Sequence, residues 1–340
     1  MLDICQTLIL KLETLFKIDK IEFPNQPVFL APMEDVTDTI FRKICKSFGA
    51  DMMYTEFVSS DGLIRNVNSS LKKLNITDEE RPIGIQIYGH LIDAMVEAAK
   101  IAEDAKPELI DINFGCPVKK IAKRGAGSGM MNDVPKMVQI TKEIVNAVTL
   151  PVTVKTRLGY DDDNKNIVEI AERLQDVGIK AITIHGRTRS QMYKGDADWT
   201  LIGEVKNNPR MKIPVIGNGD IDSPEKAKLM FNKFGVDAIM IGRATVGRPW
   251  IFEEIKNYLI NNDLKFSLSL SQKIEIVKNH LSISISEKGE KTGILLMRRH
   301  FAHYFKNLPN FRETKIRLLT SLDYSDIITI LDYIEATYSC

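Results

Sequence analysis

Eight short, nearly continuous apolar runs recur along the first two thirds of the chain, and helix-patterned segments separate them. The runs are PVFLAPM (27–33), MMYTEFV (52–58), IGIQIYG (83–89), LIDINFG (109–115), VTVKTRL (152–158), AITIHGR (181–187), IPVIGNG (213–219) and AIMIGRA (238–244). Runs of this kind are typical of parallel strands that are covered on both faces. The segment SPEKAKLMFNKFG between the last two runs predicts a helix, with Ser223 as its N-cap and Pro224 at its first position.

This alternation predicts an α/β fold, a TIM (β/α)8 barrel over residues 23–252. An open doubly wound sheet is the alternative, but no run fits the G-x-G-x-x-G dinucleotide fingerprint. Beyond 252, runs such as SDIITILDYIEATYS have helical spacing and few strand signals, so we expect a small all-helical domain over 253–340. Residues 1–22 precede the first unit, and we expect a lead-in helix there.

Charge and cysteine usage narrow the functional classes. The net charge is only +1, so a nucleic-acid partner has to be held by a local patch. The four cysteines are scattered without a CxxC pair, which argues against a zinc site and a disulfide framework and favours a reducing, cytoplasmic setting. We expect no bound metal. The N-terminus lacks the layout of a signal peptide, and no apolar run reaches the length of a membrane helix.

Polar side chains follow the predicted strands, where a TIM barrel carries its chemistry at the C-terminal face. Because these strand ends share one face, they predict a lined cavity. The residues at these positions are Met33, Glu34, Glu56, Gln86, Asn113, Cys116, Lys155, His185, Asn218, Gly219, Asp220, Gly242 and Arg243.

The last two strand ends predict a phosphate site. GNGD and IGRA place Gly217, Gly219 and Gly242 where backbone N–H groups can approach an anion, and Arg243 adds a positive charge. FMN fits this site, because Gln86 can bond the polar edge of its ring and Lys155 can stabilise negative charge on the reduced flavin. Plainer roles stay open for three residues: Gln86 as a strand-end amide, Lys155 as the partner of Glu56, and His185 as a satisfied interior histidine.

Seven stretches carry a family resemblance in order along residues 27–252, and a further stretch, MRRHFAHYFKNLPNFR, extends it over 297–312. The seven are APMEDVTDTIFR, IQIYG, DINFGCPVKKIAKRGAGSGMM, VKTRLGYDD, IHGRTRSQMYKGDADW, IGNGDI and MIGRATVGRPWIF. Together they resemble the tRNA-dihydrouridine synthase family, particularly its bacterial B-type branch.

The resemblance implies an FMN-binding barrel and a helical tRNA-binding domain, which together reduce particular uridines of tRNA to 5,6-dihydrouridine with NADPH as reductant. Reduced FMN then supplies hydride to C6 of the base, and Cys116 falls on the position of the proton donor to C5. The flavin-contact positions fall on Pro32, Met33, Glu34, Gln86, Lys155, His185, Asn218, Gly219, Asp220, Gly242 and Arg243.

Nearby cations would push the Cys116 thiol towards thiolate, the wrong form for a proton donor. We expect those cations to face RNA phosphates instead. In the helical region, residues 291–317 hold seven basic residues against one acidic residue, a local patch suited to RNA. Residues expected to contact the substrate or the RNA backbone are Asn113, Lys119, Lys120, Lys123, Arg124, Arg187, Arg298, Arg299, Lys306, Arg312 and Lys315.

Two other functions and one ambiguity stay open. An FMN barrel acting on a small molecule, of the dihydroorotate type, keeps the flavin but leaves the basic helical region unexplained. A non-enzymatic RNA-binding protein needs neither a flavin nor Cys116. The aromatic residues of the helical region could stack on bases, although at helical spacing they are more often core: Phe301, Tyr304, Phe305 and Phe311. We expect a monomer.

Overall fold

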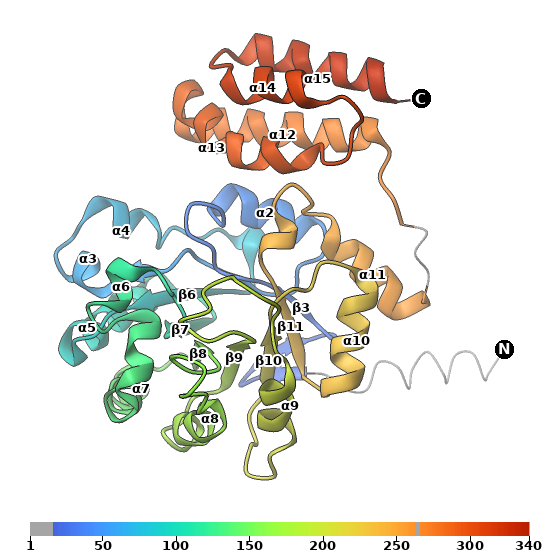
Figure 1. Ribbon diagram of the computed structural model, residues 1–340. Helices are drawn as coiled ribbons and strands as arrows, with labels where there is room; N and C mark the ends of the chain where they lie inside the picture. The colour runs from blue at the N-terminus through green and yellow to red at the C-terminus, as the bar shows by residue number, and fades with distance from the viewer. Residues whose placement is uncertain (1–15, 263–265, 340) are drawn as a thin grey trace, which may run out of the picture.

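The computed structural model describes residues 16–262 and 266–339, and its larger part is a closed parallel barrel (Figure 1). The sheet runs in the order β3-β11-β10-β9-β8-β7-β6-β4. A parallel bridge between Phe29 and Met52 closes the ring from β3 to β4. The strands are β3 (Val28–Leu30), β4 (Met53–Tyr54), β6 (Ile83–Tyr88), β7 (Leu109–Asn113), β8 (Val152–Arg157), β9 (Ala181–His185), β10 (Val215–Asn218) and β11 (Ala238–Ile241), with a short β5 (Val58–Ser59) also paired to β6. The predicted TIM barrel is therefore confirmed.

Helices surround the barrel and bury one face against its strands (Figure 1). In α10 the Ser223 hydroxyl accepts a hydrogen bond from the Lys226 N–H, as the sequence predicts for its N-cap, and Gly235 ends the helix in the left-handed conformation. The outer helices are α2 (Thr39–Ser47), α3 (Ser60–Ile64), α4 (Asn68–Lys72), α5 (Ile92–Asp104), α7 (Val134–Ala147), α8 (Ile167–Asp176), α9 (Thr200–Asn207), α10 (Pro224–Phe234) and α11 (Ile251–Asn261), and a short α6 (Lys119–Ala122) lies in the loop after β7.

A hairpin of β1 (Phe16–Ile18) and β2 (Ile21–Phe23) precedes the barrel. Over these residues the expected lead-in helix is wrong, and its first part, 1–15, lies outside the described residues. The stretch FKIDKIEF alternates apolar and polar residues, which suits strands, and Asp19 takes the positive φ that the tight turn needs. Ile18 and Phe23 pack against residues at the starts of the barrel strands, so the hairpin covers the N-terminal end of the barrel.

The C-terminal part is a bundle of α12 (Leu270–Lys288), α13 (Glu290–Tyr304), α14 (Arg312–Thr320) and α15 (Tyr324–Tyr338) with its own apolar core. Helix α11 crosses the expected boundary at 252, and Ile255 beyond that boundary still belongs to the barrel core together with Phe252. The bundle therefore begins at α12. The four aromatic residues of the basic region are all buried in the bundle core, which leaves them no face for stacking on bases: Phe301, Tyr304, Phe305 and Phe311.

Helix α2 joins the barrel to the bundle. The Phe41 ring lies 4.6 Å from the ring of His300 and 5.9 Å from that of His280, centroid to centroid. The Arg299 guanidinium donates to the backbone carbonyls of Glu34 and Asp35, in the loop after β3. The bundle is thus fixed beside the C-terminal face of the barrel, where the strands end (Figure 1).

Two neighbouring residues of α2 allow a matched test of this junction helix. Arg42 pairs with Glu80 where both side chains are buried, whereas Lys43 pairs with Glu79 at the surface. We expect Arg42→Met to lower the free energy of unfolding by about 3–5 kcal/mol, because it leaves a buried carboxylate unpaired. Lys43→Met should cost less than about 1 kcal/mol. Urea unfolding of both variants measures the difference, and equal losses would contradict it.

Candidate active site at the mouth of the barrel

The strand ends enclose a cavity of about 630 Å³ at the C-terminal face of the barrel. Most of the expected flavin-contact residues line it, together with expected substrate contacts from the loop after β7 and from the bundle. The predicted residues on its walls are Pro32, Met33, Glu34, Asn113, Cys116, Lys155, His185, Asn218, Gly219, Asp220, Gly242, Arg243 and Lys306.

Asp220 and Arg243 form the wall at the ends of β10 and β11. The Arg243 guanidinium donates to Asp220 at 2.7 Å and lies 5.2 Å from the centre of the Tyr193 ring. Asp220 also accepts from the Ala197 N–H at 2.8 Å and from Arg187 at 2.6 Å. Burial opposes ionisation of Asp220, but these donors outweigh it and lower the pKa. Asp220 therefore fixes the position of Arg243, which stays open to an anion on its exposed side.

The surroundings of Arg187 differ from the RNA contact that we expected from the sequence. Its side chain is almost fully buried, and it donates to Asp220, to the Gly195 carbonyl and to the Lys194 carbonyl. A guanidinium enclosed in this way cannot reach an RNA phosphate, so the expected RNA contact is wrong. Arg187 instead ties the loop after β9 to Asp220.

The floor of the cavity combines an amine with an imidazole. Lys155 lies 3.3 Å from the Asn218 Oδ1, whereas Glu56 accepts from the Asp35 N–H, so the alternative Lys155–Glu56 pair does not form. Burial, helped by the nearby Arg157, lowers the pKa of Lys155 to about 8. Burial and the surrounding cations hold the pKa of His185 well below its usual value, so that this imidazole is neutral at pH 7.

Cys116 lies in a loop that is held at several points. Its backbone N–H donates to the Asn113 Oδ1 at 2.9 Å, and its carbonyl accepts from the Ser128 hydroxyl at 2.8 Å. The Gly115 carbonyl accepts from the Arg157 Nε at 2.7 Å. Cys116 is only 7% exposed, and it lines the cavity.

Burial raises the pKa of the Cys116 thiol and outweighs the Val118 N–H and the nearby cations. The thiol is therefore protonated at neutral pH. The basic side chains that follow it are not among the groups that act on it, because they stand exposed to solvent on and after α6: Lys119, Lys120, Lys123 and Arg124. Their expected role at RNA phosphates stays a prediction.

Gln86 is fully buried beneath the floor rather than on the cavity wall, and its amide bonds Asp111 and Asn113. Its expected flavin contact stays a prediction. Arg157, Tyr193 and Phe57 line the cavity without having been singled out from the sequence. For Arg157 a signal existed, because it follows Lys155 by two positions on β8 and so points to the same side of the strand.

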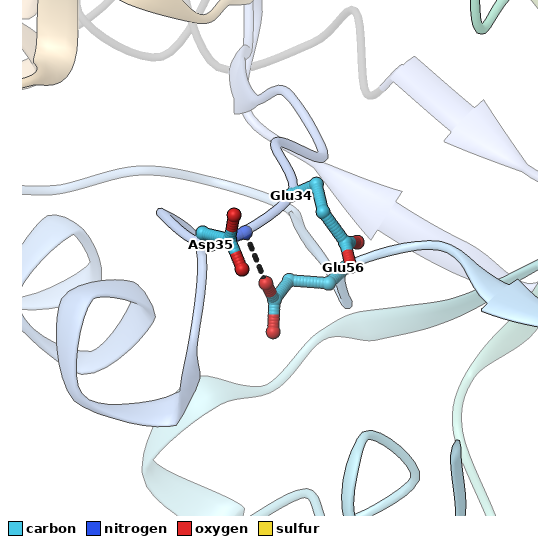
Figure 2. A group of neighbouring side chains, drawn as sticks. All are labelled: Glu34, Asp35 and Glu56. Carbon is cyan, nitrogen blue, oxygen red and sulfur yellow. Dashed lines mark hydrogen bonds between the residues drawn. The ribbon is translucent and has the colours of Figure 1, made fainter. Parts of the chain in front are cut away.

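Three carboxylates gather where the loops after β3 and β4 meet, and Figure 2 shows them: Glu34, which also lines the cavity, Asp35 and Glu56. Each offers an oxygen within 4.8 Å of the others. Burial raises the pKa of Glu56, and the opposing influence of Lys73 is smaller. Lys73 pairs with Glu34, and Arg299 lies 3.6 Å from the Asp35 carboxylate. The Asp35–Arg299 ion pair therefore joins this cluster to α13, and the Glu34–Lys73 pair joins it to the end of α4.

The expected RNA contacts of the bundle have different surroundings. Lys306 lines the cavity, whereas Arg312 is exposed and Lys315 is half-buried on α14. Arg298 donates to the Thr320 carbonyl, and Arg299 is engaged by the loop after β3. Arg299 thus holds the bundle to the barrel, and contacts of the others with RNA stay predictions.

The residues at the ends of β10 and β11 fit a phosphate-bearing cofactor. Gly219 has φ +134°, and a Cβ there would come within 2.6 Å of the Ala197 Cβ, so only glycine leaves this backbone open. A Cβ at Gly242 would lie 3.4 Å from Ala31 and Met33, filling space beside the strand end. With Arg243 alongside, this backbone forms a cradle for an anion.

The chain is a TIM-barrel protein with a cation-lined cavity at the C-terminal face of the barrel. TIM-barrel enzymes carry their active sites at this face. The family model described as dihydrouridine synthase matches residues 29–323. The chain belongs to this family. No helix in the described part of the chain is both long and apolar enough to cross a membrane.

Curated relatives and solved structures agree with this assignment and with the fold. The chain is 40% identical to tRNA-dihydrouridine synthase B of Pseudomonas aeruginosa, over 87% of this chain and 89% of the relative. It is also 40% identical to a probable tRNA-dihydrouridine synthase of Rickettsia conorii, over 88% of this chain and 90% of the relative. Histamine dehydrogenase from Rhizobium sp. 4-9 shares the fold, with a TM-score of 0.59 and 12% identity over 96% of this chain and 65% of its own.

The buried neutral His185 gives a prediction for the pH dependence of stability. Because its folded pKa lies below its unfolded value near 6.5, the unfolded chain binds the extra proton first and the free energy of unfolding falls as pH falls below 6.5. We expect His185→Asn to flatten this decline by about 1.4 kcal/mol per pH unit. His90→Asn, in the half-exposed loop after β6, is the control. Unfolding curves from pH 5 to 7 that decline equally in all three proteins would refute the prediction.

Proposed function

We propose that this protein reduces specific uridines in tRNA to 5,6-dihydrouridine, with FMN bound in the cavity, NADPH as reductant and Cys116 as the proton donor. The observation that carries the proposal is the protonated Cys116 thiol on the wall of a cavity with a phosphate cradle, in a chain that belongs to the dihydrouridine synthase family. Relatives at 40% identity that bear the name tRNA-dihydrouridine synthase support the choice of substrate.

One set of cavity residues serves the cofactor, and another set serves the base. Gly219, Gly242 and Arg243 would hold the phosphate of FMN, and Lys155 and Asn218 on the floor would contact its ring. When bound, FMN supplies the hydride that reaches C6 of the base. Lys155 is charged at neutral pH, since its pKa of about 8 lies above 7, and it stabilises negative charge near the ring.

Cys116 then gives its proton to C5 of the base. Its raised pKa keeps the proton on sulfur until the base arrives, which suits a general acid. Asn113 beside it has one amide N–H bonded to Gln86, and the side chain also lines the cavity, where it can donate to a base carbonyl. A uridine in a folded tRNA has to be flipped out to reach this depth. The exposed cations after Cys116 and on the bundle hold the flanking backbone.

Removing the thiol tests the role of Cys116. We expect Cys116→Ala to retain yellow, FMN-loaded protein and to lose dihydrouridine formation by a factor of about 100 or more, as for loss of a general acid. Single-turnover reaction of the NADPH-reduced protein with unmodified tRNA measures the product directly. Product formed at the wild-type rate would overturn the role. Free uracil and orotate serve as control acceptors, and reduction of these in preference to tRNA would favour a small-molecule enzyme.

Charge reversal on the bundle tests how RNA is held. We expect Lys315→Glu to weaken tRNA binding and to reduce the slope of log K against log salt by about 1, because one phosphate contact is lost. Lys180→Glu, on an exposed residue at the N-terminal end of the barrel, should leave both unchanged. Titration of tRNA at several salt concentrations gives both slopes, and an unaltered slope for Lys315→Glu would place the RNA elsewhere.

A further inference from the structure

A buried chain of hydrogen bonds leads from a carboxylate on β7 to the Cys116 loop. The Asp111 Oδ2 accepts from the Gln86 Nε2 at 2.6 Å, and the Gln86 Oε1 accepts from the Asn113 Nδ2 at 2.7 Å. The Asn113 Oδ1 accepts from the backbone N–H groups of Gly115 and Cys116, both at 2.9 Å. We propose that Asp111 is a positioning residue for the Cys116 thiol and acts through the two amides, Gln86 and Asn113, which we call the amide relay.

The polarity of the amide relay is fixed at both ends. The N–H groups of Gly115 and Cys116 can only donate, so Asn113 has to turn its oxygen to them and its N–H to Gln86. Gln86 then has to offer its own N–H to Asp111, which accepts. Any flipped amide would set two donors or two acceptors face to face in a buried site, where an unsatisfied polar group is costly.

Asp111 is a buried carboxyl group whose side-chain partners in the described part of the chain are Gln86 and Thr153. It is 1% exposed, and its second oxygen accepts from the Thr153 hydroxyl at 2.6 Å. Desolvation raises its pKa to about 6 despite the hydrogen bonds from Gln86 and Thr153, which shows what the burial of this group costs. The benefit of burying Asp111 lies at the other end of the amide relay, where Asn113 holds the backbone N–H groups of the Cys116 loop.

The amide relay completes the support of this loop. The Cys116 carbonyl is held by Ser128, and the Gly115 carbonyl is held by Arg157. The amide relay supplies the partners of the two N–H groups, so both sides of the peptide backbone are fixed and the sulfur keeps one place on the cavity wall. The meaning of this for proton transfer rests on the proposed function, whereas the position of the sulfur can be measured without it.

Two substitutions of Asp111 with similar branching separate its hydrogen bonds from its charge. Asp111→Asn can still accept from Gln86 and can donate to the Thr153 hydroxyl oxygen. Asp111→Leu cannot accept. In the FMN-bound protein as isolated, we expect iodoacetamide to alkylate Cys116 about tenfold faster in Asp111→Leu, the equivalent of one net hydrogen bond, and within about twofold of wild type in Asp111→Asn.

Peptide mass spectrometry reads the alkylation of Cys116, and the fully buried Cys45 reports on general loosening in the same digest. The expected result includes a Cys45 that stays unreactive. An unchanged Cys116 rate in Asp111→Leu overturns the proposal. An equal rise in Asp111→Asn overturns it as well, because the effect would then follow the charge. If Cys45 also becomes reactive in Asp111→Leu, the variant is loosened in general. The Asn113→Asp variants described next then test the proposal instead.

Reversing the hydrogen-bond direction of the amide relay should first raise the Cys116 alkylation rate and then, with a second substitution, lower it again. General destabilisation would not produce this recovery. Asn113→Asp still accepts from the two backbone N–H groups but has no N–H for Gln86. Gln86 then has to turn and present its oxygen to the Asp111 carboxylate, so we expect Cys116 to react faster. Adding Asp111→Asn supplies an N–H to that oxygen and should return the rate towards wild type. Failure of this rescue overturns the proposal.

The same proteins keep the two hypotheses distinguishable. If the wild-type protein forms no dihydrouridine from unmodified tRNA, the proposed function fails, but the alkylation rates still test the amide relay. If tRNA is reduced and the rates of Cys116 alkylation ignore Asp111, the proposed function stands and the amide relay fails.

Discussion

The register of the parallel strands is the constraint on which the site depends. Asn113 on β7 is paired with Lys155 on β8, and His185 on β9 is paired with both Arg157 and Asn218. Because alternate residues of a strand point to the same side, Lys155 and Arg157 enter the same space from one strand. A shift of any strand by one residue would turn these side chains away from the cavity and bring apolar residues in.

The strands and most of the cavity could be predicted because both follow from burial. A strand covered on two faces has to be apolar along its length, and polar residues directly after such runs have to share the C-terminal face. The hairpin at 16–23 escaped because its alternation is short and follows an amphipathic stretch that favours a helix. Nothing local shows that the bottom of the barrel lies close enough to accept Ile18 and Phe23.

The direction of a long polar side chain could not be predicted. Arg187 and Arg243 both follow a strand and a glycine, yet Arg187 is enclosed under the next loop and Arg243 reaches the cavity. Gln86 sits at a strand position that suits a ligand contact, but the amide of Asn113 covers it. In each case the neighbour that decides comes from another strand or loop, and the contact is formed only by the closed barrel.

The electrostatics of the cavity explain why the site suits an anionic ligand. Burial lowers the pKa of Lys155 to about 8 and that of Arg157 to about 10; Arg157 adds to the first shift, and Arg187 and Arg243 add to the second. Asp220 pairs with Arg187 and Arg243, whereas no carboxylate in the described residues pairs with Lys155 or Arg157; Asp111 raises the pKa of Lys155 only in part, and Tyr193 does the same for Arg157. An anionic ligand above this floor would restore both pKa values and gain from the same field. The cost of burying the cations in the free protein would then be offset when an anionic ligand binds.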